Sequence, residues 1–213
     1  MARALSVKEV DAKKLPTLTL SERWHNMVGE IAPTGVWLIW GKSGSGKSSF
    51  VMQLCKELCR HYKGIYNSLE EGISLTLQNN IRTNRMSEVN SRLAFVEESI
   101  EDLNERMTKR MSPHFYIIDS LQCTGLSPKT YDEFVNIHKK NKLIIFVSQT
   151  DGLRPKGRVG DHALFMADEK IWVEGFRAQT FGRFIGPEET FVIWPERAQA
   201  YWGAQVKADL TIK

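Results

Sequence analysis

The residues from Gly41 to Ser48 combine the types and spacing that hold a chain of phosphates. They read Gly-Lys-Ser-Gly-Ser-Gly-Lys-Ser, which fits the pattern G-x-x-x-x-G-K-[ST]. The glycines let the backbone turn tightly, so that successive N–H groups point inward at an anion. Lys47 is placed to reach the β- and γ-phosphates of a nucleotide, and the Ser48 hydroxyl is placed to bind Mg²⁺. The residues predicted to contact the nucleotide are Gly41, Lys42, Ser43, Gly44, Ser45, Gly46, Lys47, Ser48 and Ser49.

The segments on either side of this loop are those that phosphate binding requires. Residues 36–40, Val-Trp-Leu-Ile-Trp, are typical of a buried strand that runs directly into the loop. After the loop, apolar residues recur at helical spacing; they are Phe50, Val51, Leu54, Cys55, Leu58, Cys59 and Tyr62. The order strand, glycine-rich loop, amphipathic helix predicts a nucleotide site, whereas a flexible Gly/Ser linker would lack these neighbours.

Carboxylates follow two further apolar strands. Asp119 ends the strand predicted over 115–119, where it can hold Mg²⁺ directly or through water; the alternative is an aspartate that caps a turn. Glu70 and Glu71 follow the strand predicted over 64–69. One of them can polarise a water for attack on the γ-phosphate, with Glu70 favoured because it directly follows the strand, unless both are surface charges.

Gln149 follows the strand predicted over 143–147, after Ser148. Its amide can donate to the γ-phosphate and can report the nucleotide state to the segment that comes next. That segment, residues 151–161, is predicted to be a basic, glycine-containing loop that carries Arg154, Lys156 and Arg158. These cations are candidates for contacts with nucleic-acid phosphates; the alternative is a solvated loop with ordinary surface cations.

Strands alternate with helices over most of the chain. Strands are predicted over 36–40, 64–69, 92–96, 115–119 and 143–147, and helices over 21–28, 50–62, 73–84, 99–111 and 130–140. This alternation predicts an α/β fold, a parallel twisted sheet with helices on both faces, whose ligands bind beyond the carboxyl ends of the strands.

The two ends of the chain depart from this alternation. Residues 1–20 are charged and weakly patterned, and we expect a tail or a partner-binding arm ahead of a single domain over 21–213. An antiparallel extension is predicted from 170–181 paired with 190–194. A short helix over 195–202 and a last strand over 206–212 are expected to follow it.

The length, net charge and composition of the chain are those expected of a soluble domain. The chain has 213 residues, a formal net charge of +4 and 42% hydrophobic residues, which is enough for a full core. The mildly basic balance is compatible with a nucleic-acid partner but does not require one. Three cysteines without a disulfide framework, and the lack of a signal or long apolar run, lead us to expect a cytoplasmic protein without a membrane partner.

As a set, these motifs resemble the RecA-like ATPase core, the group of RecA, RadA, the DnaB helicase and KaiC. The resemblance rests on the loop at 41–48, Ser-Leu-Glu-Glu at 68–71, Tyr-Ile-Ile-Asp-Ser at 116–120 and Phe-Val-Ser-Gln at 146–149. It implies ATP and Mg²⁺ as cofactors, Glu70 as catalytic base with Glu71 as the alternative, and Gln149 as sensor. It also implies that residues 151–160 match the DNA-binding loop of the group.

The resemblance further implies a ring or filament in which a neighbour's cation completes each site. RadA and DnaB use a Lys-x-Arg pair that this sequence lacks, so Arg183 and Arg177 are the candidates here. The zinc module and protease-like tail of RadA and the amino-terminal helical domain of DnaB are not recognisable. The sequence therefore looks like a core-only member of the kind typical of phages and mobile elements.

We therefore expect a Mg²⁺-dependent ATPase that acts on DNA, single-stranded DNA in particular, in recombination, annealing or replication and as a homo-oligomer. Two alternatives stay open. A KaiC-like regulator would act on a protein partner and would hydrolyse ATP independently of nucleic acid. An ATP-gated loader would bind ATP and hydrolyse it slowly. A small-molecule kinase would need a lid and an acceptor pocket, and Asp119-Ser120, the glutamates at 70–71 and Ser148-Gln149 all argue against it.

Overall fold

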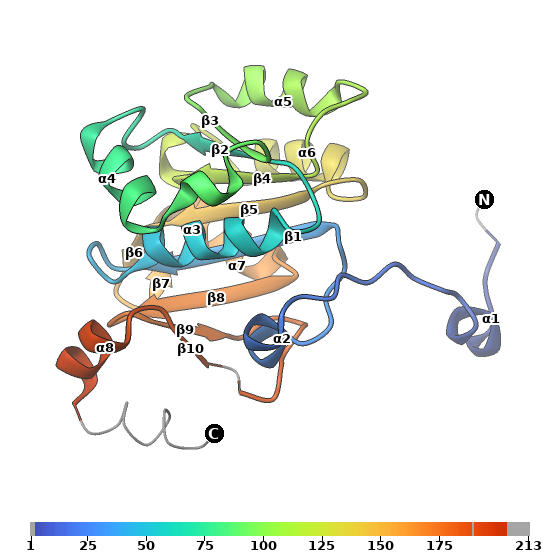
Figure 1. Ribbon diagram of the computed structural model, residues 1–213. Helices are drawn as coiled ribbons and strands as arrows, with labels where there is room; N and C mark the ends of the chain where they lie inside the picture. The colour runs from blue at the N-terminus through green and yellow to red at the C-terminus, as the bar shows by residue number, and fades with distance from the viewer. Residues whose placement is uncertain (1–2, 189, 204–213) are drawn as a thin grey trace.

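An eight-stranded sheet organises the computed structural model, which describes residues 3–188 and 190–203 (Figure 1). The strand order is β10-β9-β8-β1-β5-β4-β2-β3. The strands from β8 to β3 in this order run parallel, and β9 runs antiparallel to both of its neighbours, β8 and β10. Their bounds are β1 Gly35–Gly41, β2 Gly64–Ser68, β3 Leu93–Val96, β4 Phe115–Asp119, β5 Leu143–Ser148, β8 Glu169–Glu174, β9 Arg177–Thr180 and β10 Thr190–Val192. The predicted α/β fold class with its antiparallel extension is confirmed.

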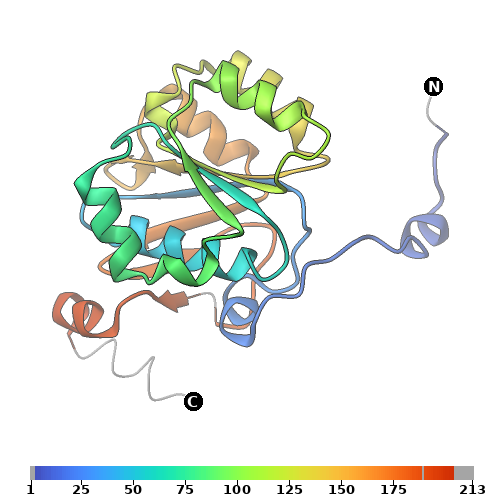
Figure 2. The same ribbon diagram turned by 45° about the horizontal axis from the view of Figure 1, so that its top comes forward.

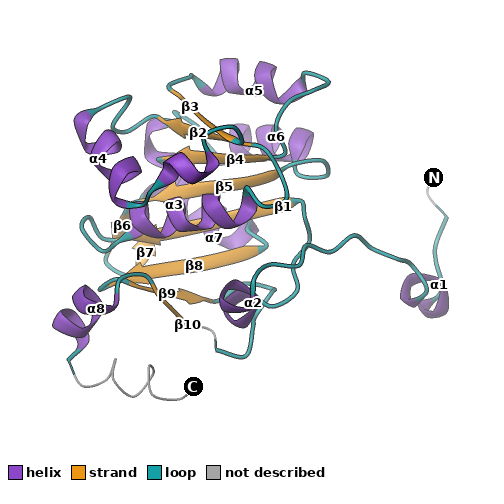
Figure 3. Cartoon of the chain, in the orientation of Figure 1, coloured by secondary structure: helices purple, strands orange, loops and turns teal. Residues whose placement is uncertain are grey.

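Helices cover both faces of the sheet (Figures 2 and 3). One face carries α2, α3 and α4, and the other carries α5, α6 and α7. The helices are α1 Val7–Asp11, α2 Glu22–Val28, α3 Lys47–Leu58, α4 Leu75–Thr83, α5 Ile100–Thr108, α6 Pro128–His138, α7 Gly157–Met166 and α8 Pro195–Trp202. Short 3₁₀ helices are η1 Met86–Val89 and η2 Leu121–Cys123.

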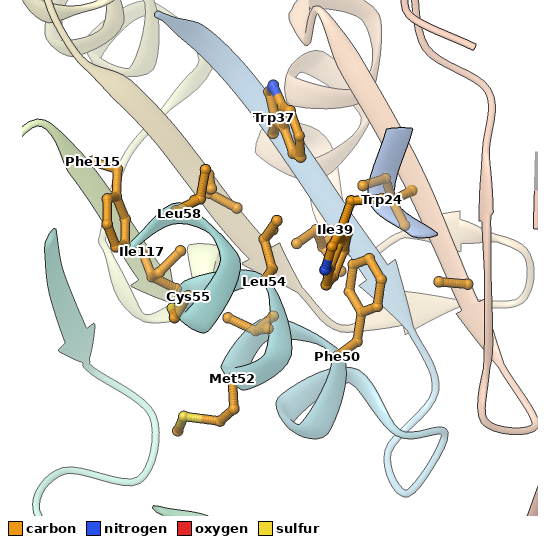
Figure 4. Packing of buried hydrophobic residues seen from close by; sticks show 14 of the residues in the cluster. Trp24, Trp37, Ile39, Phe50, Met52, Leu54, Cys55, Leu58, Phe115 and Ile117 are labelled. Atoms are coloured by element: carbon orange, nitrogen blue, oxygen red, sulfur yellow. The ribbon is translucent and has the colours of Figure 1, made fainter. Parts of the chain in front are cut away.

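Each face of β1 contributes to a separate core, because successive side chains of a strand point to opposite sides. Trp37 and Ile39 pack with the apolar face of α3, which presents Phe50 and Leu54 (Figure 4). The alternate residues of β1 join the second core, with Tyr131 of α6. With a buried side chain worth about 1.5–3 kcal/mol, these two cores fix β1, and therefore the loop that follows it, firmly in place.

The amino-terminal segment lies apart from the body of the molecule in both views (Figures 1 and 2). Its helix α1 has a complete capping box, in which Ser6 and Glu9 bond reciprocally, but it buries no residue. The chain then enters the core at Leu18 and Leu20, which are 3% and 4% exposed. Leu18 also forms an isolated bridge with Ile31. The packed body therefore starts at Leu18, inside the segment predicted as a tail.

Two stretches differ from the sequence prediction. The single strand predicted over 170–181 is two antiparallel strands, β8 and β9. Gly175 and Phe176 both have positive φ, +52° and +60°, which reverses the chain. A positive φ at a phenylalanine is rare, so the apolar pattern of residues 170–181 did not predict a turn at Phe176.

The basic loop predicted over 151–161 is also more regular than expected. It contains a small hairpin, β6 Thr150–Asp151 and β7 Arg154–Pro155, after which α7 begins at Gly157. Gly152, with φ +62°, allows this tight turn. The helix predicted over 195–202 coincides with α8, and the strand predicted over 206–212 lies outside the described residues.

Candidate nucleotide-binding site

The phosphate loop leaves β1 at a point where only glycine fits. A side chain at Gly41 would clash with the Val173 carbonyl of β8, which lies directly beside it. The loop ends at Gly46, whose φ of +102° is accessible to glycine but rarely to other residues. From there α3 begins at Lys47, so the free N–H groups and the positive end of a twelve-residue helix face the loop.

The Lys47 side chain folds back over this loop. Its Nζ donates to the carbonyl oxygens of Gly41 and Lys42, at 2.8 and 2.9 Å. Burial lowers the pKa of this amine, while the negative charges of Asp119 and Glu70 act in the opposite direction. Its two acceptors are neutral carbonyls of the loop, so the ammonium can turn to an anion without leaving a charged partner unpaired.

A cavity of about 270 Å³ opens beside the loop, where the carboxyl ends of β2, β4 and β5 meet. It brings together the predicted catalytic and metal-binding residues Lys47, Ser48, Glu70, Asp119 and Gln149. Other lining residues are Ser43, Gly44, Gly46, Ser49, Glu71, Thr76, Asn80, Ser120, Val147, Ser148, Phe176 and Arg197. The predicted contacts Gly41, Lys42 and Ser45 do not line the cavity. They shape the back of the loop instead, where Ser45 N–H donates to Lys42 O and Ser45 O accepts from Phe176 N–H.

Asp119 lines this cavity and accepts a hydrogen bond from the Tyr66 hydroxyl. The pKa of Asp119 is raised to about 6, mainly by burial and also by the neighbouring Glu70 and Glu71, while Tyr66 and Lys47 act in the opposite direction. A carboxylate so short of countercharge gains strongly from a cation. Tyr66 was not predicted as a site residue, although a tyrosine inside a short buried strand is a signal that its hydroxyl needs a partner.

Glu70 and Gln149 meet across the mouth of the cavity. Gln149 Nε2 donates to Glu70 Oε1 at 2.7 Å. The backbone of Glu70 is tied to the same region, because its N–H donates to the Asp119 carbonyl oxygen at 3.1 Å. Glu71 also lines the cavity, but no hydrogen bond of its side chain to Gln149 is found in the described residues. The two glutamates therefore differ in that Glu70 accepts a hydrogen bond from the predicted sensor Gln149.

The residues present fit a magnesium nucleotide. Asp119 and Ser48 offer one carboxylate and one hydroxyl to the same cavity. No group of three or more His, Cys, Asp or Glu side chains that could hold a metal occurs in the part of the chain described. The Asp119 carboxylate and the Ser48 hydroxyl suit Mg²⁺, which keeps waters and phosphate oxygens as most of its ligands and needs few from the protein.

Phe176 and Arg197 were missed by the sequence analysis, although both line the cavity. Phe176 sits at the turn between β8 and β9, and Arg197 belongs to α8. The Arg197 guanidinium lies 5.2 Å from the Phe176 ring and 4.4 Å from the Trp194 ring. Only the fold brings these segments to the phosphate loop, so no local pattern could have indicated them.

The predicted nucleic-acid residues lie outside the nucleotide cavity. Arg154 Nε pairs with Asp161 Oδ1 at 2.8 Å, and this pair is largely exposed. Lys156 and Arg158 are exposed at the start of α7. Arg158 also lines a shallow surface pocket with Lys129 of α6. The three cations therefore share one surface segment, but Arg154 already has an acidic partner.

The two arginines predicted to act on a neighbouring subunit do not line the cavity of their own chain. Arg183 Nη1 pairs with Asp168 Oδ1 at 3.0 Å. Arg177, on β9, lies with its guanidinium 5.4 Å from the Trp202 ring. Both are thus held by contacts within the chain, and both lie toward the β8–β10 side of the sheet.

A phosphate loop between β1 and α3, with acidic and amide residues at the ends of β2, β4 and β5, defines the RecA-like class of P-loop proteins. The chain has this fold, and the resemblance found in its motifs is confirmed by comparison with known proteins. It is 27% identical over 182 residues to the DNA repair protein RadA of Streptococcus pneumoniae. It is 25% identical over 198 residues to the proteins of the same name from Streptococcus pyogenes and Halalkalibacterium halodurans.

These similarities cover 78%, 84% and 85% of this chain, respectively. The chain spans 42% of the length of each of these curated relatives, so the similarity concerns part of RadA. No protein-family model matches the chain. Among the helices of the described residues, none has the length and apolar character needed to cross a membrane. The expected origin in a phage or mobile element stays a prediction.

Proposed function

We propose that this protein binds ATP with Mg²⁺, hydrolyses it, and couples hydrolysis to the binding of DNA, single-stranded DNA in particular, as a cytoplasmic homo-oligomer. One observation carries the ATPase proposal: Lys47, Ser48, Glu70, Asp119 and Gln149 line a single cavity beside the phosphate loop. The similarity to proteins named for DNA repair supports the DNA partner.

Each residue has a role that its environment favours. The loop N–H groups and Lys47 bind and orient the β- and γ-phosphates. Ser48 and Asp119 would hold Mg²⁺, which would supply positive charge to neutralise the phosphate oxygens. Glu70 orients a water and takes its proton, because its carboxylate is exposed at the mouth of the cavity. Gln149 donates a hydrogen bond to Glu70 and lines the same cavity.

The DNA contact is assigned to the hairpin segment, defined here as residues 150–158. It begins directly after Gln149 and carries Arg154, Lys156 and Arg158. Exposed cations of this kind bind the phosphate backbone without reading the base sequence. No aromatic residue lies within the hairpin segment, so base stacking there is not expected.

The test is ATP hydrolysis with and without single-stranded DNA, at low and moderate salt, beside the Lys47→Ala variant. Stimulation by DNA that fades as salt rises, with turnover abolished in the variant, is the expected result, because backbone contacts release counterions. Turnover that depends on Lys47 but responds to no nucleic acid would instead favour a KaiC-like regulator with a protein partner.

A further inference from the structure

The side chain of Gln122, in η2 just after β4, uses its whole amide in hydrogen bonds to two other segments. Its Nε2 donates to Ser148 Oγ at 2.8 Å and to the Lys156 carbonyl oxygen at 3.0 Å. Its Oε1 accepts from the Gln149 backbone N–H at 3.0 Å. Gln122 thus joins η2 to the end of β5 and to the end of the hairpin segment.

The contacts fix the orientation of this amide. If the amide were flipped, its NH₂ group would face the Gln149 N–H, and its oxygen would face the Lys156 carbonyl. Both pairings are repulsive, so only the observed orientation satisfies all three partners. A half-buried side chain with every polar atom in use is held rigidly, and its loss leaves several groups unpaired.

The same contacts connect the hairpin segment with the candidate catalytic residues. Lys156 N–H donates to the Gln149 carbonyl oxygen at 2.9 Å, which closes the base of the hairpin segment. Ser148 Oγ donates to that same carbonyl oxygen at 2.8 Å. On its other side the Gln149 side chain donates to Glu70 at 2.7 Å. Few, short contacts therefore join Lys156 to Gln149 and Gln149 to Glu70.

We propose that Gln122 is a positioning residue that couples the hairpin segment to the Glu70–Gln149 pair. Binding of a polyanion at the hairpin segment shifts Lys156, and Gln122 carries this shift to Gln149 and so to Glu70. The coupling rests on the proposed function, because it supplies the route by which DNA changes hydrolysis. Gln122 itself does not line the nucleotide cavity. It acts on turnover and not on ATP binding.

The variants Gln122→Ala and Gln122→Glu separate the contacts. Alanine removes all three. Glutamate keeps an acceptor for the Gln149 N–H but has no donor for Ser148 Oγ or for the Lys156 carbonyl oxygen, while the Ser148 hydroxyl still donates to the Gln149 carbonyl oxygen. Glutamate thus loses the two contacts that Gln122 donates, including the one to the hairpin segment, and keeps the one that it accepts. Gln179→Ala, at an exposed position of β9, is the matched control.

Both Gln122 variants are expected to bind ATP and single-stranded DNA about as tightly as the unaltered protein. The ratio of kcat with DNA to kcat without DNA is expected to fall to about 1, while KM for ATP changes less than about threefold. The control keeps the original ratio. A purely structural role would instead lower the melting temperature and affinity in both variants and leave the ratio unchanged, which would overturn the proposal.

Hydrogen–deuterium exchange tests the coupling without DNA. In the unaltered protein, a non-hydrolysable ATP analogue with Mg²⁺ is expected to slow amide exchange in the hairpin segment at least twofold. In both variants the phosphate loop is still protected, but the hairpin segment no longer responds. Equal responses in the variant and unaltered proteins, or no response in the unaltered protein, contradict the proposal. Protection with no DNA stimulation would refute only the DNA partner.

Discussion

Glu70 is the residue whose role depends most on a single contact. It is the carboxylate that Gln149 touches, and it follows β2 at the edge of the nucleotide cavity, beside Glu71. Both glutamates are exposed, so replacing one of them should not disturb the packing around the other. Their roles can therefore be separated by removing one charge at a time.

We expect Glu70→Gln to lower kcat by about 10²–10⁴-fold with ATP binding retained, because a positioned general base contributes that much. Single-turnover hydrolysis and nucleotide titration measure the two effects. Glu71→Gln is the matched control and should stay within about tenfold of the unaltered protein. A larger loss in Glu71→Gln would identify Glu71 as the base. Slow turnover unaffected by either change would favour the ATP-gated loader.

Glu169, at the start of β8, is a fully buried carboxylic acid. Thr180 Oγ1 donates to its Oε1, while its Oε2 has no partner in the described residues. The pKa of Glu169 is raised to about 8, mainly by burial and also by Asp168, against backbone hydrogen bonds from Phe184 and Lys170 and the charge of Lys170. The folded protein therefore retains a proton that an unfolded chain releases from about pH 4.5 upward.

The free energy of unfolding is consequently expected to fall as pH rises from about 5 to 8, by up to about 1.4 kcal/mol per pH unit from this group. Glu169→Gln removes this dependence, so between pH 5 and pH 8.5 the free energy of unfolding of the variant should rise relative to that of the unaltered protein by on the order of 4 kcal/mol. Urea unfolding at several pH values measures it. Glu30→Gln, at an exposed position, is the control, and parallel pH profiles for all three proteins would contradict the assignment.

At the scale of elements, apolar patterning determined most of the fold. The strand predicted over 115–119 coincides with β4, and those over 64–69 and 143–147 agree with β2 and β5 within one residue. These apolar strands are buried on both faces and end at polar residues, so their positions can be predicted from the sequence. Because parallel strands end at one edge, the meeting of Glu70, Asp119 and Gln149 was also predictable.

The remaining parts of the site depend on contacts between distant segments. Tyr66 reaches Asp119 only through the pairing of β2 with β4, and Gln122 reaches Lys156 only because η2 lies against the end of β5. Phe176 is placed by a turn with unusual backbone angles. Local propensity carries no information on these pairings, so tyrosine, glutamine and phenylalanine at these positions looked ordinary in the sequence.

At the scale of the whole molecule, the proposed oligomer implies that each nucleotide site includes a residue of a neighbour. Arg183 and Arg177 are the candidates on this chain, and neither lines its own cavity. The pair between the exposed Arg183 and the half-buried Asp168 lies near the surface and is worth about 1 kcal/mol, so Arg183→Ala should leave the fold intact.

Mixing two inactive variants tests this arrangement. Arg183→Ala keeps an intact phosphate loop, and Lys47→Ala keeps an intact arginine, so an interface between them holds one complete site. In an equal mixture we expect about a quarter of the unaltered ATPase rate, the share of interfaces that pair the intact halves in a head-to-tail assembly. Arg177→Ala is treated in parallel. Mixtures no more active than the separate variants would exclude both arginines from a shared site.

The amino-terminal arm, residues 3–17 with helix α1, offers a way to measure assembly by limited proteolysis. Lys13 and Lys14 lie on the exposed stretch between α1 and the first core residue, Leu18. Trypsin cleavage there removes α1 but leaves every contact of the packed body in place, since α1 buries nothing. The rate of this cut, followed against protein concentration and nucleotide, reports directly whether a neighbouring copy covers the arm.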